Sequence, residues 1–198
     1  MNNQRSYSYL AARAISNLFL PPFVLFCSFS VIISSREVHP EKHLIFNIIS
    51  LLLLVILPIV FFILLMKLKK VSDQDALNKS ERNIPYLFGI LLSLIGLIYF
   101  KITNANIAML GSWTAIMLSV VLVFIVNLKW KISAHLMSFT VAAANLGFFC
   151  NGLFFFLLLL APLLGWTRMY LKSHTLMQVT AGFAAGFILS YISFIYFQ

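Results

Sequence analysis

His174 is one of two histidines in this chain whose neighbours could support chemistry. It follows Arg168 and Lys172, and it lies at the start of the last uncharged segment. Gln178 comes four residues later, so in a helix its side chain shares a face with the imidazole. His174 therefore combines a potential nucleophile with nearby cations and a hydrogen-bonding partner.

His135 has similar surroundings. It follows two lysines and Ser133 at the predicted start of another apolar helix. Free backbone N–H groups and the helix dipole at such a start favour an anion, and a phosphate group would fit there. Arg82 and Lys79 are expected to reach the same side of the molecule from a polar loop.

Together these segments provide two imidazoles, two arginines, one or two lysines and a serine, without a cluster of carboxylates or cysteines. This set suits phosphate chemistry without a metal or another cofactor, because cations neutralise the oxyanions, one histidine attacks phosphorus and the other supplies a proton. The alternative is structural: the cations anchor helix ends at the membrane surface, and the histidines are merely interfacial. The residues alone leave both interpretations open.

The segments that would position these residues are long and apolar. The chain has 198 residues, of which 62% are hydrophobic and 10% are charged, whereas soluble domains carry roughly 25% charged residues. About 20 apolar residues cross a hydrocarbon core of ~30 Å as a helix. The uncharged runs long enough to do so are 14–35, 44–66, 83–100, 102–128, 132–167 and 173–198.

The run 132–167 is too long for one crossing, because as a single helix it would extend ~54 Å. Gly147, Asn151 and Gly152 predict a turn near its middle, which gives two short helices at about 133–149 and 152–167. The chain is therefore predicted to be a single all-α membrane domain, 1–198, with about seven spans, or six if one short helix does not cross. A membrane β-barrel is excluded because the apolar runs do not alternate.

With seven spans, most of the positive charge falls on one side. Eleven of the 14 lysines and arginines are expected on this cation-rich face, and only Arg36, Lys42 and Lys101 on the other. The positive-inside rule places the cation-rich face in the cytoplasm, which for a bacterial protein means the inner face of the inner membrane. The eleven are Arg5, Arg13, Lys67, Lys69, Lys70, Lys79, Arg82, Lys129, Lys131, Arg168 and Lys172.

The net charge of +9 favours a membrane surface or an anionic lipid as the partner of this chain. A nucleic acid is not expected, because no soluble domain is available to present a groove. The sequence does not indicate an oligomeric state.

Three segments resemble the motifs of the type 2 phosphatidic acid phosphatase superfamily: KSERNIPY (79–86), KISAH (131–135) and TRMYLKSHTLMQ (167–178). The family's third motif is Ser-Arg, five residues, His, three residues and Asp. Arg168 and His174 have this separation, whereas Thr167 replaces the serine and Gln178 stands at the position of the aspartate. This is the most specific of the three matches.

The other two matches are partial. In the second motif, Pro-Ser-Gly-His, Ser133 and His135 are present. The first motif has a lysine and an Arg-Pro pair, and here two residues separate Arg82 from Pro85. The resemblance covers about 67–198, while the two spans in 1–66 add no motif. Two predicted spans separate each motif from the next, so all three are expected on the same face.

The resemblance implies a metal-independent phosphomonoesterase that acts on phosphatidate, phosphatidylglycerol phosphate or a polyprenyl phosphate or diphosphate. It also implies that His174 attacks phosphorus to form a phosphohistidine and that His135 protonates the leaving oxygen. The phosphate-binding residues would be Arg168, Ser133, Arg82 and Lys79.

Gln178 would orient His174 by accepting its Nδ1 proton. A neutral amide does not stabilise a positive imidazole as a carboxylate does, so the enzyme is expected to be slow. The alternative is a weak or inactive relative that binds lipid phosphate or serves as a membrane partner in an assembly. A transporter fits less well, because no acidic residue lies inside a predicted span.

Overall fold

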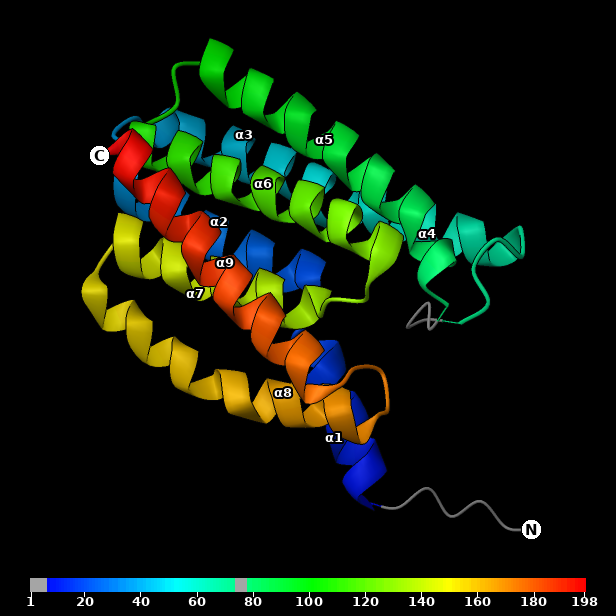
Figure 1. Cartoon of the computed structure of the whole chain (residues 1–198). Helices are drawn as coiled ribbons and strands as arrows, with labels where there is room; N and C mark the ends of the chain where they lie inside the picture. The colour runs from blue at the N-terminus through cyan, green and yellow to red at the C-terminus, as the bar shows by residue number, and fades with distance from the viewer. Residues whose placement is uncertain (1–6, 74–77) are drawn as a thin grey trace, which may run out of the picture.

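The computed structural model describes residues 7–73 and 78–198, and every regular element within them is helical (Figure 1). The predicted all-α fold is therefore confirmed. A helix satisfies its own backbone hydrogen bonds, which is what a chain surrounded by lipid requires. Arg5, which was assigned to the cation-rich face, lies outside the described residues.

The first predicted span is bent. Helix α1 (Tyr7–Leu18) and helix α2 (Pro21–Arg36) meet at an angle of 45°, so the expectation of one continuous helix through 14–35 was wrong. Pro21 and Pro22 have no N–H group to continue a helix from α1, but proline is well suited to the first turn of a new one. The break at Phe19 and Leu20 follows from this pair.

The second span is continuous but irregular. Helix α3 (Pro40–Leu51) passes through a π-helical segment, η1 (Leu52–Ile56), into α4 (Leu57–Lys67). Pro58, the second residue of α4, cannot donate the usual helical hydrogen bond. A wider π-type turn accommodates the missing donor without ending the helix.

The next two spans form an antiparallel pair. A 3₁₀ turn, η2 (Lys79–Arg82), leads into α5 (Asn83–Ile102), and a short loop connects α5 to α6 (Ile107–Lys129). Asn106 begins α6 by accepting a hydrogen bond from the backbone N–H of Ala108, at 2.9 Å. A side-chain cap of this kind satisfies one of the N–H groups left free at a helix start.

The long run 132–167 folds back as predicted. Helix α7 (Ala134–Phe149) ends before Cys150, and Asn151 starts the 3₁₀ segment η3 (Gly152–Leu160), which continues as α8 (Ala161–Tyr170). The larger rise of a 3₁₀ helix extends these 19 residues to roughly 33 Å, enough to cross a hydrocarbon core. The last helix is α9 (Leu176–Phe197).

Five helical stretches are long and apolar enough to cross a membrane, and the bent pair α1–α2 makes a sixth. The remaining apolar helix, α7, has only 16 residues, of which 13 are buried. It packs against α2, α6, α9 and η3 and is enclosed by them. These features indicate an integral, multi-pass membrane protein with a short helix at its centre.

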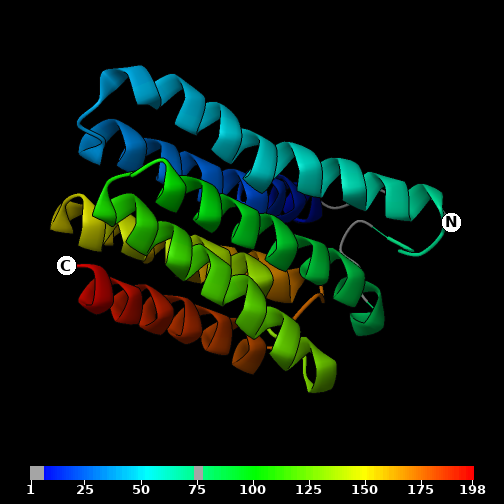
Figure 2. The same ribbon diagram turned by 90° about the horizontal axis from the view of Figure 1, so that it is seen from above.

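The helices run back and forth between two ends of the bundle (Figures 1 and 2). The start of α1 and the start of α9 lie at one end, together with the loops that carry the three sequence motifs; we call this the cation-rich end. Arg36, Lys42 and Lys101 lie at the opposite end, where α2 and α5 terminate and α3 begins. The predicted distribution of charge between the two ends is thus present in the fold.

Helix α9 approaches α7 very closely near the cation-rich end. A Cβ atom at Gly182 would lie 2.6 Å from the backbone oxygen of Ser133, and one at Gly186 would lie 2.6 Å from that of Met137. The absence of a side chain at these two positions lets the backbones meet, as is common where membrane helices pack. The backbone N–H of Ser133 also donates to the carbonyl of Gln178, at 3.1 Å.

The arrangement of the ends can be tested by labelling. A variant without Cys27 and Cys150 would receive a single cysteine, either Asn78→Cys at the cation-rich end or Asn151→Cys at the opposite end; both positions are exposed. A membrane-impermeant maleimide should label the two variants from opposite sides of oriented vesicles. If both are labelled from the same side, α7 does not connect the two ends across the membrane.

Candidate active site

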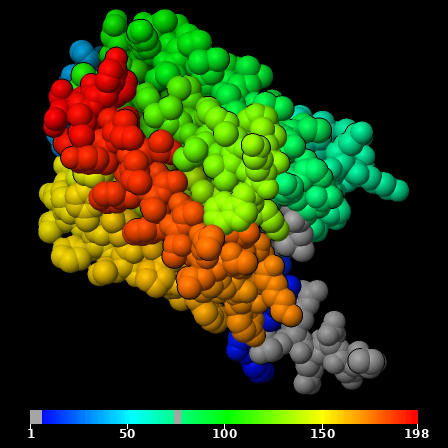
Figure 3. Space-filling model, in the orientation of Figure 1, coloured from blue at the N-terminus to red at the C-terminus, as the bar shows by residue number. Residues whose placement is uncertain are grey.

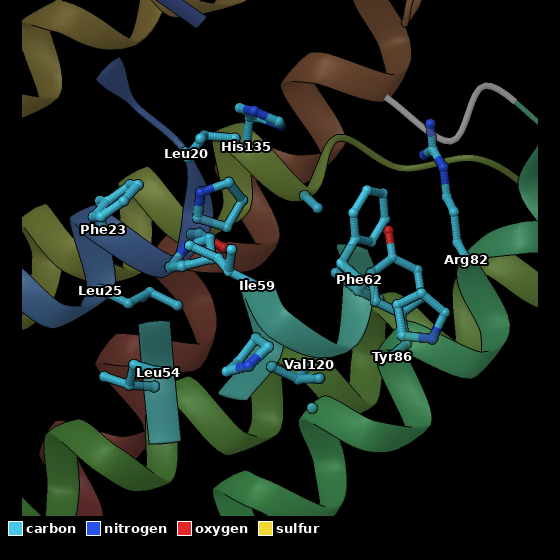
Figure 4. A pocket seen from close by; sticks show the side chains of 18 of the residues that line it. Leu20, Phe23, Leu25, Leu54, Ile59, Phe62, Arg82, Tyr86, Val120 and His135 are labelled. Carbon is cyan, nitrogen blue, oxygen red and sulfur yellow. The ribbon is translucent and has the colours of Figure 1, made fainter. Parts of the chain in front are cut away.

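The cation-rich end opens onto a cavity of about 810 Å³ between the α1–α2 bend, α4, α5 and the first turns of α7. Most of its lining is apolar and comes from α2, the η1–α4 stretch, α5 and α6. In Figure 4, His135 and Arg82 lie toward one end of this cavity and Leu54 and Val120 toward the other. The polar and charged lining residues are Arg13, Ser16, Asn17, Arg82, Tyr86, Ser93, Ser119, His135, Ser138, Arg168 and His174.

His174 lies in the loop between α8 and α9 and is 8% exposed. Its Nδ1 atom is 3.1 Å from Oε1 of Gln178. The same oxygen accepts the backbone N–H of Thr175 at 3.2 Å, and the hydroxyl of Thr175 accepts the backbone N–H of Gln178 at 3.4 Å. This capping box fixes the amide. Because its oxygen only accepts, Nδ1 of His174 carries the proton and Nε2 keeps the lone pair.

Arg168 connects the site to the first helix. Its side chain is 1% exposed, and Nη1 donates to Oγ of Ser16 at 2.6 Å. Its backbone oxygen accepts the N–H groups of Ser173 at 3.0 Å and His174 at 3.3 Å. The same residue therefore contributes charge to the cavity and shapes the loop that holds His174.

Sequence reasoning missed the contribution of α1. Arg13, Ser16 and Asn17 all line the cavity, although 1–66 shows no family motif. Residues three and four positions apart share a helical face, so the spacing of these three polar residues was a signal that could have been used. Tyr86 was also missed; it lies one turn after Arg82 and lines the same cavity.

His135 and Ser133 start α7, but only His135 lines the cavity. Ser133 is completely buried, and its hydroxyl caps α7 by accepting the N–H of Leu136 at 3.4 Å. Its hydrogen bond to the Gln178 carbonyl joins the starts of α7 and α9. Ser133 therefore lies within the framework that connects the two histidine-bearing segments.

Arg82 and Lys79 come from the same turn but lie in different places. Arg82 is 6% exposed and lines the cavity. The ammonium group of Lys79 instead donates to the backbone oxygens of Leu128 and Lys129, each at 3.2 Å. Lys79 thus caps the end of α6, as cations near helix C-termini commonly do, and it is not among the residues that line the cavity.

The electrostatic environment strongly favours the neutral form of His174. Burial, together with the charges of Arg82, Arg168 and Lys131, lowers the pKa of this imidazole to about 3, and the hydrogen bond to Gln178 only partly opposes this shift. Partial burial and the charge of Arg82 also lower the pKa of Lys131. The site is therefore a region of positive potential with an uncharged imidazole, which suits an incoming anion.

No group of three or more His, Cys, Asp or Glu residues that could hold a metal ion occurs within 7–73 and 78–198. Comparison of the chain with family models, curated proteins and solved structures gave no match. The resemblance to the lipid phosphatase motifs therefore depends on the individual residues described above.

The titration of His174 can be measured directly. In protein labelled with ¹⁵N-histidine, its imidazole should stay neutral from pH 8 down to about pH 4 and protonate near pH 3, with His174→Gln providing the assignment. Because this pKa lies below the usual value of about 6.5, His174 stabilises the fold above pH 6.5, and that contribution is lost as the pH falls toward 3. Arg82→Met should raise the pKa, because it removes a repelling charge.

A His174 resonance that titrates near pH 6.5 in the parent protein would contradict this description of the site. So would an unchanged pKa in Arg82→Met. Lys101→Met, at the opposite end of the bundle, is the control for a loss of positive charge far from the imidazole.

Proposed function

We propose that this chain is a membrane enzyme that hydrolyses the phosphate monoester of a lipid through a phosphohistidine on His174. The observation that carries this proposal is the position of His174 at the cationic end of an otherwise apolar cavity, with Nδ1 held by Gln178. The substrate class is a membrane lipid phosphate, such as phosphatidate, phosphatidylglycerol phosphate or a polyprenyl phosphate or diphosphate.

The shape and lining of the cavity support an amphiphilic substrate. Cavities of about 300–1,000 Å³ commonly hold small-molecule ligands, and this cavity of about 810 Å³ is within that range. Apolar side chains such as Leu25, Leu54 and Phe62 would surround the lipid chain. Arg82 and Arg168 would bind the phosphate oxygens, because guanidinium groups form strong, geometrically specific hydrogen bonds with phosphate.

In the proposed reaction, the Nε2 lone pair of His174 forms a bond to phosphorus while the bond between phosphorus and the lipid oxygen breaks. His135 donates a proton to that oxygen, so the lipid leaves as an alcohol, or as a lipid monophosphate where the substrate is a diphosphate. Water then attacks the phosphohistidine, the N–P bond breaks, and inorganic phosphate is released, with neutral His135 accepting a proton from the water. Gln178 keeps Nδ1 protonated and the ring oriented throughout.

The neutral amide at position 178 favours a second candidate function. The imidazole becomes positively charged when it is phosphorylated, and Nδ1 contacts the amide oxygen of Gln178, with no carboxylate from 7–73 or 78–198 beside it to stabilise that charge. A chain with this arrangement could bind a lipid phosphate at Arg82 and Arg168 without turnover, or present it to a partner protein.

The hydrolysis proposal is tested with several lipid phosphates in detergent micelles containing EDTA. The parent protein should release inorganic phosphate from at least one of them. His174→Ala should reduce the rate to background, and His135→Ala should reduce it by roughly 10²- to 10⁴-fold, the usual contribution of a general acid. Lys101→Met should match the parent. No release from any lipid, or equal rates in the parent and His174→Ala, would reject His174 as the nucleophile.

Gln178→Asp distinguishes the two candidate functions. A carboxylate at this position should raise the basicity of His174 and stabilise its positive charge, so phosphate release should increase by about 10-fold if the pKa rises by one. Gln178→Ala should slow the reaction because the ring loses its orientation. If the parent is inactive and Gln178→Asp gains activity, the natural chain is a lipid-phosphate-binding protein. Rates identical in all three proteins would exclude an orienting role for Gln178.

A further inference from the structure

A second cavity, of about 430 Å³, adjoins His174 at the cation-rich end of the bundle. It is formed by the loop between α8 and α9, the segment that precedes α7 and the first turn of α9. Figure 3 shows this loop, in orange, beside the end of α6 and the segment that follows it, in yellow-green. The lining residues are Lys131, Met169, Lys172, Ser173, His174, Thr175 and Gln178.

Among the described residues, His174 alone lines both cavities. The larger cavity contains Arg82, Arg168 and His135, whereas the second contains Gln178, the hydrogen-bonding partner of Nδ1. The imidazole thus separates an apolar cavity suited to a lipid from a polar pocket at the end of the bundle. A ligand in the second pocket would lie next to the His174–Gln178 pair without competing for the space of the lipid.

The lining of this pocket fits a small anion. Its lining includes two lysines, Lys131 and Lys172, and two hydroxyl-bearing residues, Ser173 and Thr175, and no carboxylate among the described residues. Ser173 is 2% exposed, and its hydroxyl has no hydrogen-bonding partner within the described part of the chain. An unsatisfied buried hydroxyl is costly, so a bound oxyanion that accepts its hydrogen bond would remove that cost.

The backbone at Lys172 is also unusual. Its φ of 54° is in the left-handed region that non-glycine residues seldom adopt. It belongs to the hydrogen-bonded turn that ends α8, in which the N–H of Lys172 donates to the carbonyl of Met169 at 2.9 Å and the N–H of Ser173 to that of Arg168 at 3.0 Å. Here the conformation falls at the turn directly before Ser173 and His174, within the lining of the pocket.

We propose that this second pocket binds a small oxyanion, such as phosphate or sulfate, which supplies beside His174 the negative charge that Gln178 lacks. The bound anion offsets the positive charges that surround the imidazole: Arg82 from the start of α5, Arg168 from α8 and Lys131 from the segment before α7. The other titratable or charged groups that line the larger cavity are His135 on α7, Arg13 on α1 and Tyr86 on α5. Asp73, near Lys131, is the carboxylate whose charge reaches this region.

The predicted consequence for catalysis depends on the proposed function, but binding of the anion does not. If His174 forms a phosphohistidine, an anion in the pocket should stabilise the positively charged ring, as a carboxylate at position 178 would. Sulfate or phosphate at low millimolar concentration should then raise the rate of phosphate release several-fold in the parent. The increase should be absent in Gln178→Asp, which carries the charge covalently.

Anion binding is tested without reference to activity, by following the ¹⁵N resonances of His174 during a sulfate titration at constant ionic strength with chloride. Sulfate should raise the pKa of His174 by about one, as expected for an opposite charge within 4–6 Å. The response should be lost in Lys131→Met and in Lys172→Met. It should persist in Lys101→Met, the control at the far end, and in Arg168→Met, which changes the starting pKa of His174 but leaves the lining of the second pocket intact.

The opposite pattern would overturn the proposal. A response lost in Arg168→Met but kept in both lysine variants would place the anion at the lipid-phosphate site alone. A parent protein whose His174 does not respond to sulfate would show that the pocket does not bind an oxyanion, whatever the result of the hydrolysis assay. Lysine variants that retain the parent's circular dichroism spectrum and melting temperature exclude unfolding as the cause of a lost response.

Discussion

The close backbone approach of α9 to α7 is the contact on which the candidate site depends. Gly182 and Gly186 remove the side chains that would otherwise separate the two helices, since a Cβ at either position would lie 2.6 Å from a backbone oxygen of α7 or its N-cap. The hydrogen bond from Ser133 to the carbonyl of Gln178 joins the same two helix starts. His135 and His174 are thereby held on adjacent segments, although 38 residues separate them in the sequence.

A second contact makes the N-terminal helices part of the site. Arg168 is almost completely buried and is bonded to Ser16 on α1. A long cationic side chain buried at this depth requires fixed polar partners, because desolvation of the charge is expensive. The segment 1–66 therefore does more than anchor the chain: α1 positions an arginine of the third motif, and α2 and α4 supply much of the apolar wall of the cavity. Because of the bend at Pro21, α1, which holds Arg168, and α2, which forms part of the apolar wall, meet at the same cavity.

The sequence was sufficient to predict the features that depend on length and local spacing. The all-α fold, the reversal near Asn151 and the contact between His174 and Gln178 follow from apolar run length, turn residues and an i, i+4 spacing. The bend before Pro21 was missed because run length and charge do not show whether a backbone is continuous, although the Pro21–Pro22 pair is itself a local signal for a new helix start. The positions of Lys79 and Ser133 also could not be predicted, since the choice between capping a helix and lining a cavity depends on tertiary contacts.

The cations of the bundle likewise divide into those that bind the ends of helices and those that line a cavity. At the opposite end, Arg36 donates to the backbone oxygens of Phe149 and Cys150, and Lys42 donates to that of Thr103 at 3.1 Å. These charges bind helix ends, as that of Lys79 does. Arg82 and Arg168 instead line a cavity where their positive potential acts on a buried, neutral imidazole. A count of charges establishes which end is basic, whereas the positions of the side chains in the fold show which cations face a cavity, and Arg82 and Arg168 face the larger one.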